Sequence, residues 1–298
     1  MPVLSIISCE MLEDELTHIL SEDRKLHQLI LADSAEIRGL ARKLSAQNRP
    51  YIVADIDRIS KLVKKQRNPC SRSCVPTRDT RILDAVDRLL SRVRGEHKDT
   101  VVAHVLNVEL HADPELLKEE LCKNVERMAS FSDGILVLYG VCDSLRELEV
   151  ACGGCTCPLY FLTDKDGTKV EDCIALALGG NDARWHTPLI HRGIVFYLTP
   201  KLASWAMSPA RQTLLNSYTR RRAKMDQQLI RNIERLLKRT RFKKVAKLDT
   251  GLRYEPNFDE NVQDYAQLRK LEVIPLTGST DIVERCYQRA KTGIRVQP

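Results

Sequence analysis

The chain has 298 residues, with 47 Lys or Arg against 40 Asp or Glu, so its formal net charge at pH 7 is +7. This length can bury one large core or two of ordinary size, and a fold of this size does not need disulfides for stability. No apolar run reaches the about 18 residues of a membrane span, and the first residues lack the basic leader of a secretory signal. We therefore expect a cytoplasmic protein whose ten cysteines serve as thiols, metal ligands or redox partners rather than as structural bridges.

Short apolar runs alternate with helical patterns along the chain. Strands are expected at residues 3–9, 26–33, 99–110, 133–142, 157–164, 193–200, 243–251 and 271–279. Helices are expected at residues 10–22, 34–47, 78–95, 112–131, 144–154, 169–180, 201–238, 260–271 and 280–293. Residues 50–66 are typical either of a strand with a trailing helix or of a helix alone.

Local signals support some of these boundaries. Ser34 is in position to cap the helix that follows it, and Asp113 before Pro114 is typical of a helix start. Residues 133–142 are nearly all apolar, as in a strand that is buried on both faces.

The alternation of strands and helices predicts an α/β fold. We expect mainly parallel sheets flanked by helices, arranged as two doubly wound lobes with a cleft. The expected lobes are residues 1–133 and residues 134–298.

Three cysteines lie where a strand ends or a helix begins. Cys9 ends the first expected strand, Cys142 ends the strand at 133–142, and Cys173 begins a helix directly after Asp172. Functional sites of parallel α/β folds form at the carboxyl ends of strands, so we expect these three thiols to converge. Each of them alone is more typical of a small buried residue.

A second group of thiols surrounds a Gly-Gly pair. Cys152, Cys155 and Cys157 form a C-x2-C-x-C arrangement, in which two thiols three residues apart can bind one metal ion. Glycines let backbone amides approach sulfur, and such contacts tune iron–sulfur clusters. A site with four thiolates needs one more cysteine, and Cys142 is the nearest one. The loop either extends the first site, builds a second one or only packs around it.

The remaining cysteines have simpler interpretations. Three residues separate Cys70 from Cys74 in a basic, turn-rich segment. This pattern is consistent with metal ligands and equally with incidental surface thiols. Cys122 and Cys286 lie inside helical patterns and are expected in the core.

Thiolates select soft or borderline metals, namely zinc, copper(I) or iron–sulfur clusters. Three thiolates leave a position for a fourth ligand or for a substrate, and Glu10 or Asp172 could supply an oxygen there or support a ligand. We expect an iron–sulfur cluster as the first choice and zinc as the second.

Four further residues are candidate cofactor ligands. His111 ends an expected strand and is the best single histidine, although no spacing joins it to a cysteine. Asp249, Thr250 and Gly251 follow an apolar strand, where α/β folds bind ligands, or else they form a capping turn. The sequence contains none of the motifs of serine hydrolases, phosphate loops or dinucleotide-binding folds.

Basic residues concentrate in two segments, 60–75 and 219–244. The second has apolar residues at helical spacing, so an amphipathic helix with a solvated basic face is a better interpretation than a nucleic-acid interface. Aromatic residues make up only 5% of the chain, which leaves few platforms for stacking bases. A protein partner that binds these basic segments is a further expectation.

Seven short motifs occur in order along the chain. They are "IISCEMLEDEL" at 6–16, "LHADPELLKEEL" at 110–121, "ILVLYGVC" at 135–142, "EDCIALALGG" at 171–180, "FYLTP" at 196–200, "VAKLDTGL" at 245–252 and "IPLTGS" at 274–279. With this ordered set the chain resembles the family named domain of unknown function 1638, found in methanogenic archaea and anaerobic bacteria. The motifs cover most of the chain and leave residues about 34–99 as an insertion in the N-terminal lobe.

The resemblance implies a site and a metabolic setting. The recurring cysteines of the family correspond to Cys9, Cys142 and Cys173. Its members often occur in gene neighbourhoods with corrinoid-dependent methyltransferases, which implies a role near one-carbon metabolism. Two departures stand out: Glu171 takes the place of the histidine before Asp-Cys, and "DSL" takes the place of the glycines after Cys142.

Together these observations predict a cysteine-ligated metal protein linked to anaerobic one-carbon or corrinoid methyl-transfer metabolism. Such a protein is either an enzyme acting on a methyl-group carrier or one that handles a metallocofactor. A corrinoid is a further expected ligand, and a corrinoid protein or a methyltransferase is the expected partner. The alternative is a metal-free module that binds a corrinoid, a tetrapyrrole or a partner in a larger assembly.

Overall fold

The computed structural model describes residues 2–67, 99–141, 152, 154–186, 195–208 and 243–296. The chain divides into two compact units. The first comprises Met1–Glu10, Leu16–Leu162 and Arg285–Pro298, and the second comprises Met11–Glu15 and Thr163–Glu284. The expected helix at 78–95 lies outside the described residues, as does most of the expected helices at 144–154 and 201–238.

The first unit contains a six-stranded sheet in the order β3-β2-β4-β1-β5-β6, in which every neighbouring pair is parallel. Its strands are β1 (Val3–Cys9), β2 (Leu26–Ala32), β3 (Ile52–Ala54), β4 (Asp99–Leu106), β5 (Gly134–Leu138) and β6 (Leu159–Phe161). All residues of β1, β4 and β5 are buried, as expected for central strands of a parallel sheet with both faces covered.

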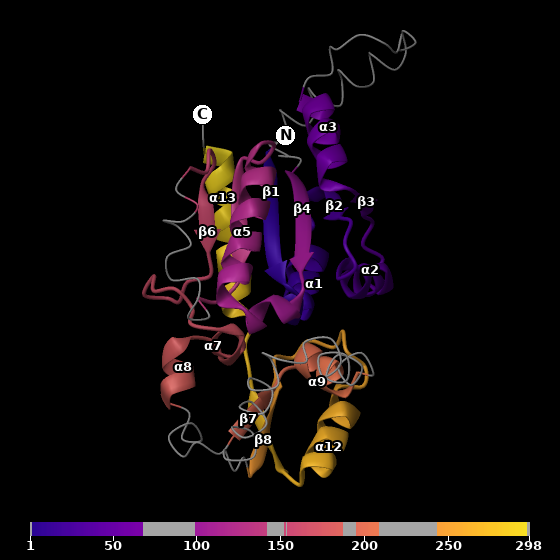
Figure 1. Ribbon diagram of the computed structural model, residues 1–298, viewed down its shortest axis with the longest axis vertical. Coiled ribbons are helices and arrows are strands. Elements are labelled where there is room, and N and C mark those ends of the chain that lie inside the picture. The colour runs from indigo at the N-terminus through magenta and orange to yellow at the C-terminus, as the bar shows by residue number, and fades with distance from the viewer. Residues whose placement is uncertain are drawn as a thin grey trace, which may run out of the picture. The chain divides into compact units, whose positions relative to one another are not determined.

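Helices join these strands in a doubly wound pattern. They are η1 (Glu10–Leu12), α1 (Glu13–Glu22), α2 (Ile37–Ala46), α3 (Ile56–Arg67), η2 (Val108–Ala112) and α5 (Pro114–Ala129). The last helix of the chain, α13 (Asp281–Val296), joins no strands of this sheet but packs against it. The chain runs outward from β1 through β2 to β3, then outward the other way from β4 through β5 to β6. Right-handed connections therefore place α1 and α2 on one face of the sheet and α5 on the other, where α5 contacts α3. Figure 1 shows α5 in front of the strands and α13 behind α5.

Three local predictions, at residues 50–66, at residues 99–110 and at Ser34, can be compared with the structure. Residues 50–66 form both a strand and a helix, β3 and α3. The strand expected at 99–110 ends at Leu106, because the Asn107 side chain accepts the Glu109 N–H and starts η2. Ser34 does not cap α2, whose N-cap position is Glu36 without a side-chain cap.

A buried ionic cluster attaches the C-terminal helix to the first unit. Lys291 pairs with Asp23 and, at 3.0 Å, with Asp99, and all three side chains are at least 95% buried. Arg295 also pairs with Asp99, and the Tyr287 hydroxyl donates to Asp23 at 2.7 Å. Burial raises the pKa of Asp23, but the hydrogen bonds from Lys291 and Tyr287 and the Lys291 charge outweigh it, so the pKa lies below its usual range. The cluster thus holds α13 against the amino ends of β2 and β4.

Two glycines, one in β5 and one in α13, allow α13 to pack closely against the sheet. A Cβ at Gly134 in β5 would lie 2.6 Å from an Ile294 methyl carbon of α13. A Cβ at Gly293 would lie 2.1 Å from the Tyr160 hydroxyl oxygen of β6. Larger residues at these positions would push α13 away from the sheet.

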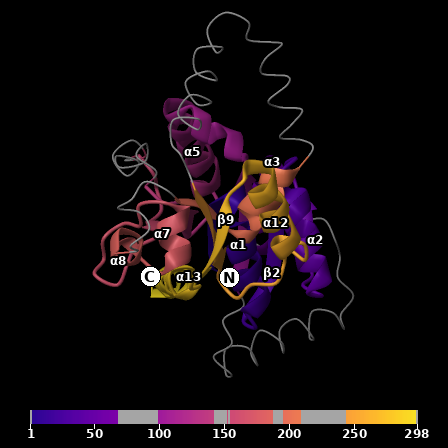
Figure 2. The same cartoon turned by 90° about the horizontal axis from the view of Figure 1, so that it is seen from below.

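The second unit contains a three-stranded parallel sheet in the order β7-β8-β9. Its elements are β7 (Val195–Leu198), β8 (Lys244–Asp249), β9 (Glu272–Thr277), α7 (Cys173–Leu178), α8 (Asn181–His186), α9 (Pro200–Met207) and α12 (Phe258–Arg269). Figure 2 shows β9 running beside α12. The Thr199 hydroxyl caps α9 directly after β7, which fixes where this helix leaves the sheet.

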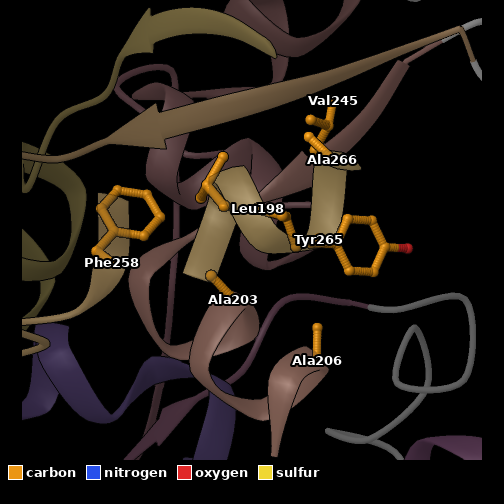
Figure 3. Packing of buried hydrophobic residues seen from close by; sticks show 8 residues of the cluster. Leu198, Ala203, Ala206, Val245, Phe258, Tyr265 and Ala266 are labelled. Atoms are coloured by element: carbon orange, nitrogen blue, oxygen red, sulfur yellow. The ribbon is translucent and has the colours of Figure 1, made fainter. Parts of the chain in front are cut away.

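A hydrophobic cluster joins α9 and α12 to β7 and β8. It consists of Leu198, Ala203, Ala206, Val245, Phe258, Val262, Tyr265 and Ala266. Figure 3 shows the small side chains of α9 facing the larger ones of α12, so the two helices can approach closely. Tyr265 also stacks on Phe196, with ring centroids 5.6 Å apart.

The α/β class, with mainly parallel sheets flanked by helices, is confirmed. Strands β5 and β6, which follow the expected boundary at residue 133, pair within the six-stranded sheet. The cleft between lobes stays a prediction. Among the described residues, no helix combines the length and the apolar character that crossing a membrane requires.

Replacing Lys291 should destabilise the protein strongly. Lys291→Met leaves two buried carboxylates short of a counter-charge, which typically costs about 3–5 kcal/mol of unfolding free energy. Lys123 is the matched control, because its side chain is 60% exposed and pairs only on the surface of α5. Urea denaturation should show a change within about 0.5 kcal/mol for Lys123→Met. Equal small losses in both variants would contradict the role of the cluster.

Stability should fall as the pH drops from about 6.5 to about 4 because of His104. This β4 side chain is 8% exposed, and burial, followed by the Arg127 charge, lowers its pKa from 6.5 to about 4. The unfolded chain therefore takes up a proton in this window while the folded chain does not, at a cost of about 3 kcal/mol. The free energy of unfolding should be measured against pH. Its decrease in this window should disappear in His104→Gln and persist in His27→Gln, in which an exposed histidine is replaced. The same slope in both variants would rule His104 out as the source.

Candidate functional site

Cys9 and His111 meet at the carboxyl edge of the six-stranded sheet. Cys9 is the last residue of β1, and its Sγ lies 3.3 Å from Nε2 of His111. Cys9 pairs in register with Leu106 at the end of the neighbouring strand β4. Beyond Leu106, the cap formed by Asn107 turns the chain into η2, which carries His111 back to the sulfur. No spacing motif in the sequence joins His111 to a cysteine, so this contact became visible only in the structure.

Tyr139 adds a third strand end to this site. It directly follows β5, the other neighbour of β1, and its ring stacks on His111 with centroids 5.8 Å apart and planes 15° apart. Stacking restricts rotation of the imidazole and so fixes the direction of its nitrogens. The carboxyl ends of β4, β1 and β5 therefore contribute one side chain each, as parallel sheets favour.

Partial desolvation of the ring favours the neutral form of His111, although the residue as a whole is exposed. Cys9 is 3% exposed, and the desolvation lowers the pKa of His111. The imidazole is therefore neutral at pH 7, the form that binds metals and accepts protons. Tetrahedral zinc, with bonds of about 2.3 Å to sulfur and about 2.0–2.1 Å to nitrogen, separates such ligands by about 3.5 Å. The observed 3.3 Å fits two ligands of one ion and also fits a direct hydrogen bond.

Three glutamates, Glu10, Glu36 and Glu109, lie close enough to one another near this edge of the first unit to interact electrostatically. Burial raises the pKa of Glu109, and the charges of Glu10 and Glu36 raise it further. The Asn107 amide donates to Glu36 at 3.0 Å, which connects the cap of η2 to this acidic group. Negative charge near Cys9 and His111 favours a cation over an anion as the bound species.

The expected thiol trio is only partly accounted for. Cys142 lies outside the described residues, and Cys173 belongs to the second unit. The described parts of the chain hold no group of three or more His, Cys, Asp or Glu side chains arranged to bind one metal ion. The convergence of Cys9, Cys142 and Cys173 therefore stays a prediction.

Cys173 is the first residue of α7. Oδ1 of Asp172 accepts the N–H groups of Ile174 and Ala175 at 2.9 and 2.8 Å, so this carboxylate caps the helix. This capping role accounts for an aspartate directly before Cys173 without a metal ligand at that position.

The Asp249, Thr250 and Gly251 segment forms a closed turn in the second unit. Asp249 accepts the Gly251 N–H at 2.9 Å and pairs with Arg253 at 2.7 Å. The hydrogen bond from Arg253 is the main cause that lowers the pKa of Asp249. Gly251 has φ 82°, a conformation that favours glycine. These contacts agree with the capping-turn interpretation, and ligand binding by these three residues stays a prediction.

The loop cysteines form two pairs in the first unit. Sγ of Cys152 lies 2.9 Å from Sγ of Cys122 in α5, and Sγ of Cys155 lies 3.8 Å from Sγ of Cys157. The Cys155 N–H donates to the Cys152 carbonyl oxygen at 2.9 Å, which closes the turn between them. Burial, followed by contact with the neighbouring thiol, raises the pKa of both Cys152 and Cys157 to about 12. The expectation that Cys122 lies in the core was wrong, because this residue is partly exposed, whereas Cys286 is buried as expected. The helical pattern around Cys122 gave no sign of a partner thirty residues later in the chain.

Comparison with known proteins identifies a family and no individual relative. No curated protein and no solved structure matches the chain. The family model described as "Protein of unknown function (DUF1638)" matches residues 105–287. His111, Cys142 and Cys173 lie within the matched range, and Cys9 lies before it. Because the match covers more than half of the 298 residues, the chain belongs to the DUF1638 family.

Proposed function

We propose that this chain is a metalloprotein that uses Cys9 and His111 as ligands of one metal ion. The observation that carries the proposal is the 3.3 Å separation between the sulfur of buried Cys9 and the ring nitrogen of exposed His111 at the carboxyl end of β1. A neutral imidazole beside a thiol is a donor set typical of zinc and related ions. Since iron–sulfur clusters take mainly thiolates, the histidine makes a single ion a better candidate than a cluster.

Each side chain at this edge would have a defined task. Cys9 would provide a thiolate and His111 its neutral Nε2, while Tyr139 would hold the ring in place by stacking. Cys142, three residues after Tyr139 in the chain, is the best candidate for a third ligand. When bound, the ion would supply Lewis acidity at an open coordination position, where a substrate thiol or water could bind. The nearby carboxylates would add to the attraction for a cation.

The proposed substrate class is a methyl-group carrier of anaerobic one-carbon metabolism. This step rests on the family resemblance and its association with corrinoid-dependent methyltransferases. A carrier thiol would lose its proton on binding to the ion that Cys9 and His111 would hold, and the thiolate is the better nucleophile. Its sulfur could then form a bond to the methyl carbon of a corrinoid partner, while the cobalt–carbon bond breaks and its electron pair stays on cobalt.

Metal analysis of protein purified without oxygen tests the centre. Wild-type protein should contain about one zinc or iron per chain, and Cys9→Ser and His111→Gln should each lower the affinity at least about 10-fold. Cys286→Ala is the matched control, because this cysteine is buried in α13 at 1% exposure. Circular dichroism should confirm that all three variants fold. After cobalt(II) substitution, the sulfur-to-cobalt absorption of the wild type should be clearly weaker in Cys9→Ser.

Two results would contradict the proposal. One is wild-type protein without stoichiometric metal, and the other is unchanged metal affinity in Cys9→Ser and His111→Gln. Metal-free protein that still binds a corrinoid would support the binding-module alternative instead.

A further inference from the structure

The thiols of Cys122 and Cys152 are unusually close in the first unit. Their sulfur atoms are 2.9 Å apart, and the two residues are separated by thirty positions in the chain. Cys122 belongs to α5, and Cys152 precedes β6. The contact therefore joins a helix to the segment that leads into the edge strand of the sheet.

The distance distinguishes a bond-forming pair from two ligands of one ion. Two thiolates bound to a tetrahedral zinc ion, with zinc–sulfur bonds of about 2.3 Å, are about 3.7 Å apart. The 3.8 Å between Cys155 and Cys157 agrees with that value, whereas the 2.9 Å between Cys122 and Cys152 is clearly shorter. A disulfide bond is about 2.05 Å long, so these sulfurs need to move only about 0.9 Å to form one.

We propose that Cys122 and Cys152 are a redox-active dithiol that forms a reversible disulfide between α5 and the segment before β6. This site is independent of the Cys9–His111 centre. Its oxidant would be a low-molecular-weight disulfide, the class of compound that exchanges with protein thiols in cells.

The exposures of the two thiols set the order of steps. Cys122 is partly exposed, whereas Cys152 is 4% exposed. The Cys122 thiolate attacks one sulfur of the oxidant, whose S–S bond breaks and releases one thiol after protonation. The Cys152 sulfur then loses its proton and attacks the Cys122 sulfur, which forms the protein disulfide and releases the second thiol. Two protein thiols and one small disulfide thus give one protein disulfide and two small thiols.

Proximity compensates for the weak acidity of Cys152. Burial and the contact with Cys122 raise its pKa to about 12, so only a small fraction is thiolate at pH 7. The second step is nevertheless intramolecular, and effective concentrations in such steps are far above those of a free thiol. The turn closed by the Cys155 N–H holds the Cys152 backbone in place for this attack.

Peptide mapping after defined oxidation tests the proposal. Full-length reduced protein is incubated with mixtures of oxidised and reduced glutathione, free thiols are alkylated, and peptides are analysed by mass spectrometry without reduction. The expected product is a cross-linked peptide pair joining Cys122 to Cys152, which disappears after treatment with dithiothreitol. Cys122→Ala and Cys152→Ala should each abolish it, and Cys286→Ala should leave its yield unchanged.

Three outcomes would overturn the proposal. The first is wild-type protein in which Cys122 and Cys152 stay reduced or carry only glutathione. The second is a disulfide from Cys152 to Cys155 or Cys157 in place of Cys122. The third is a zinc ion that Cys9→Ser retains and Cys122→Ala loses, since the thiols would then be metal ligands. None of these results depends on whether Cys9 and His111 bind metal.

Discussion

Parallel pairing of β1 with β4 on one side and β5 on the other brings together the side chains of the candidate site in the first unit. Because the three strands run the same way, the residues that follow them emerge at one edge of the sheet. Cys9 ends β1, His111 follows β4 and Tyr139 follows β5, and the three side chains form one continuous set of contacts. They lie far apart in the chain, so a different strand order would separate them.

The buried charges lie at the opposite end of the same strands, where the strands begin. Asp99 is the first residue of β4, and Asp23 precedes β2, with Lys291 between their carboxylates. Buried ion pairs contribute little net stability but are very sensitive to loss of one partner, so they favour one docking position of a helix over others. We infer that this cluster specifies where α13 lies. The sheet therefore separates the two tasks, with the charge cluster at its amino edge and the candidate metal ligands at its carboxyl edge.

The sequence predicted local structure well and long-range contacts poorly. Apolar runs located β1 and the start of β5, and the order Asp113-Pro114 located the start of α5, because these signals depend on neighbouring residues. The strand expected to end at Cys142 ends at Leu138 instead. The end of β4 was wrong by a few residues, since the apolar pattern continued through a turn that a side-chain hydrogen bond at Asn107 creates. The contacts of Cys9 with His111 and of Cys122 with Cys152 depend on strand order and helix packing. The spacing of these residues along the sequence reveals neither.

The central claim is that sulfur of Cys9 and nitrogen of His111 share one metal ion. X-ray absorption spectroscopy at the edge of the metal found in oxygen-protected protein tests it most directly, because it identifies the neighbouring atoms. For zinc, the account predicts a mixed first shell with sulfur at about 2.3 Å and imidazole nitrogen at about 2.0–2.1 Å, and loss of the nitrogen component in His111→Gln. A shell of sulfur alone, or a nitrogen component that His111→Gln leaves intact, would contradict it.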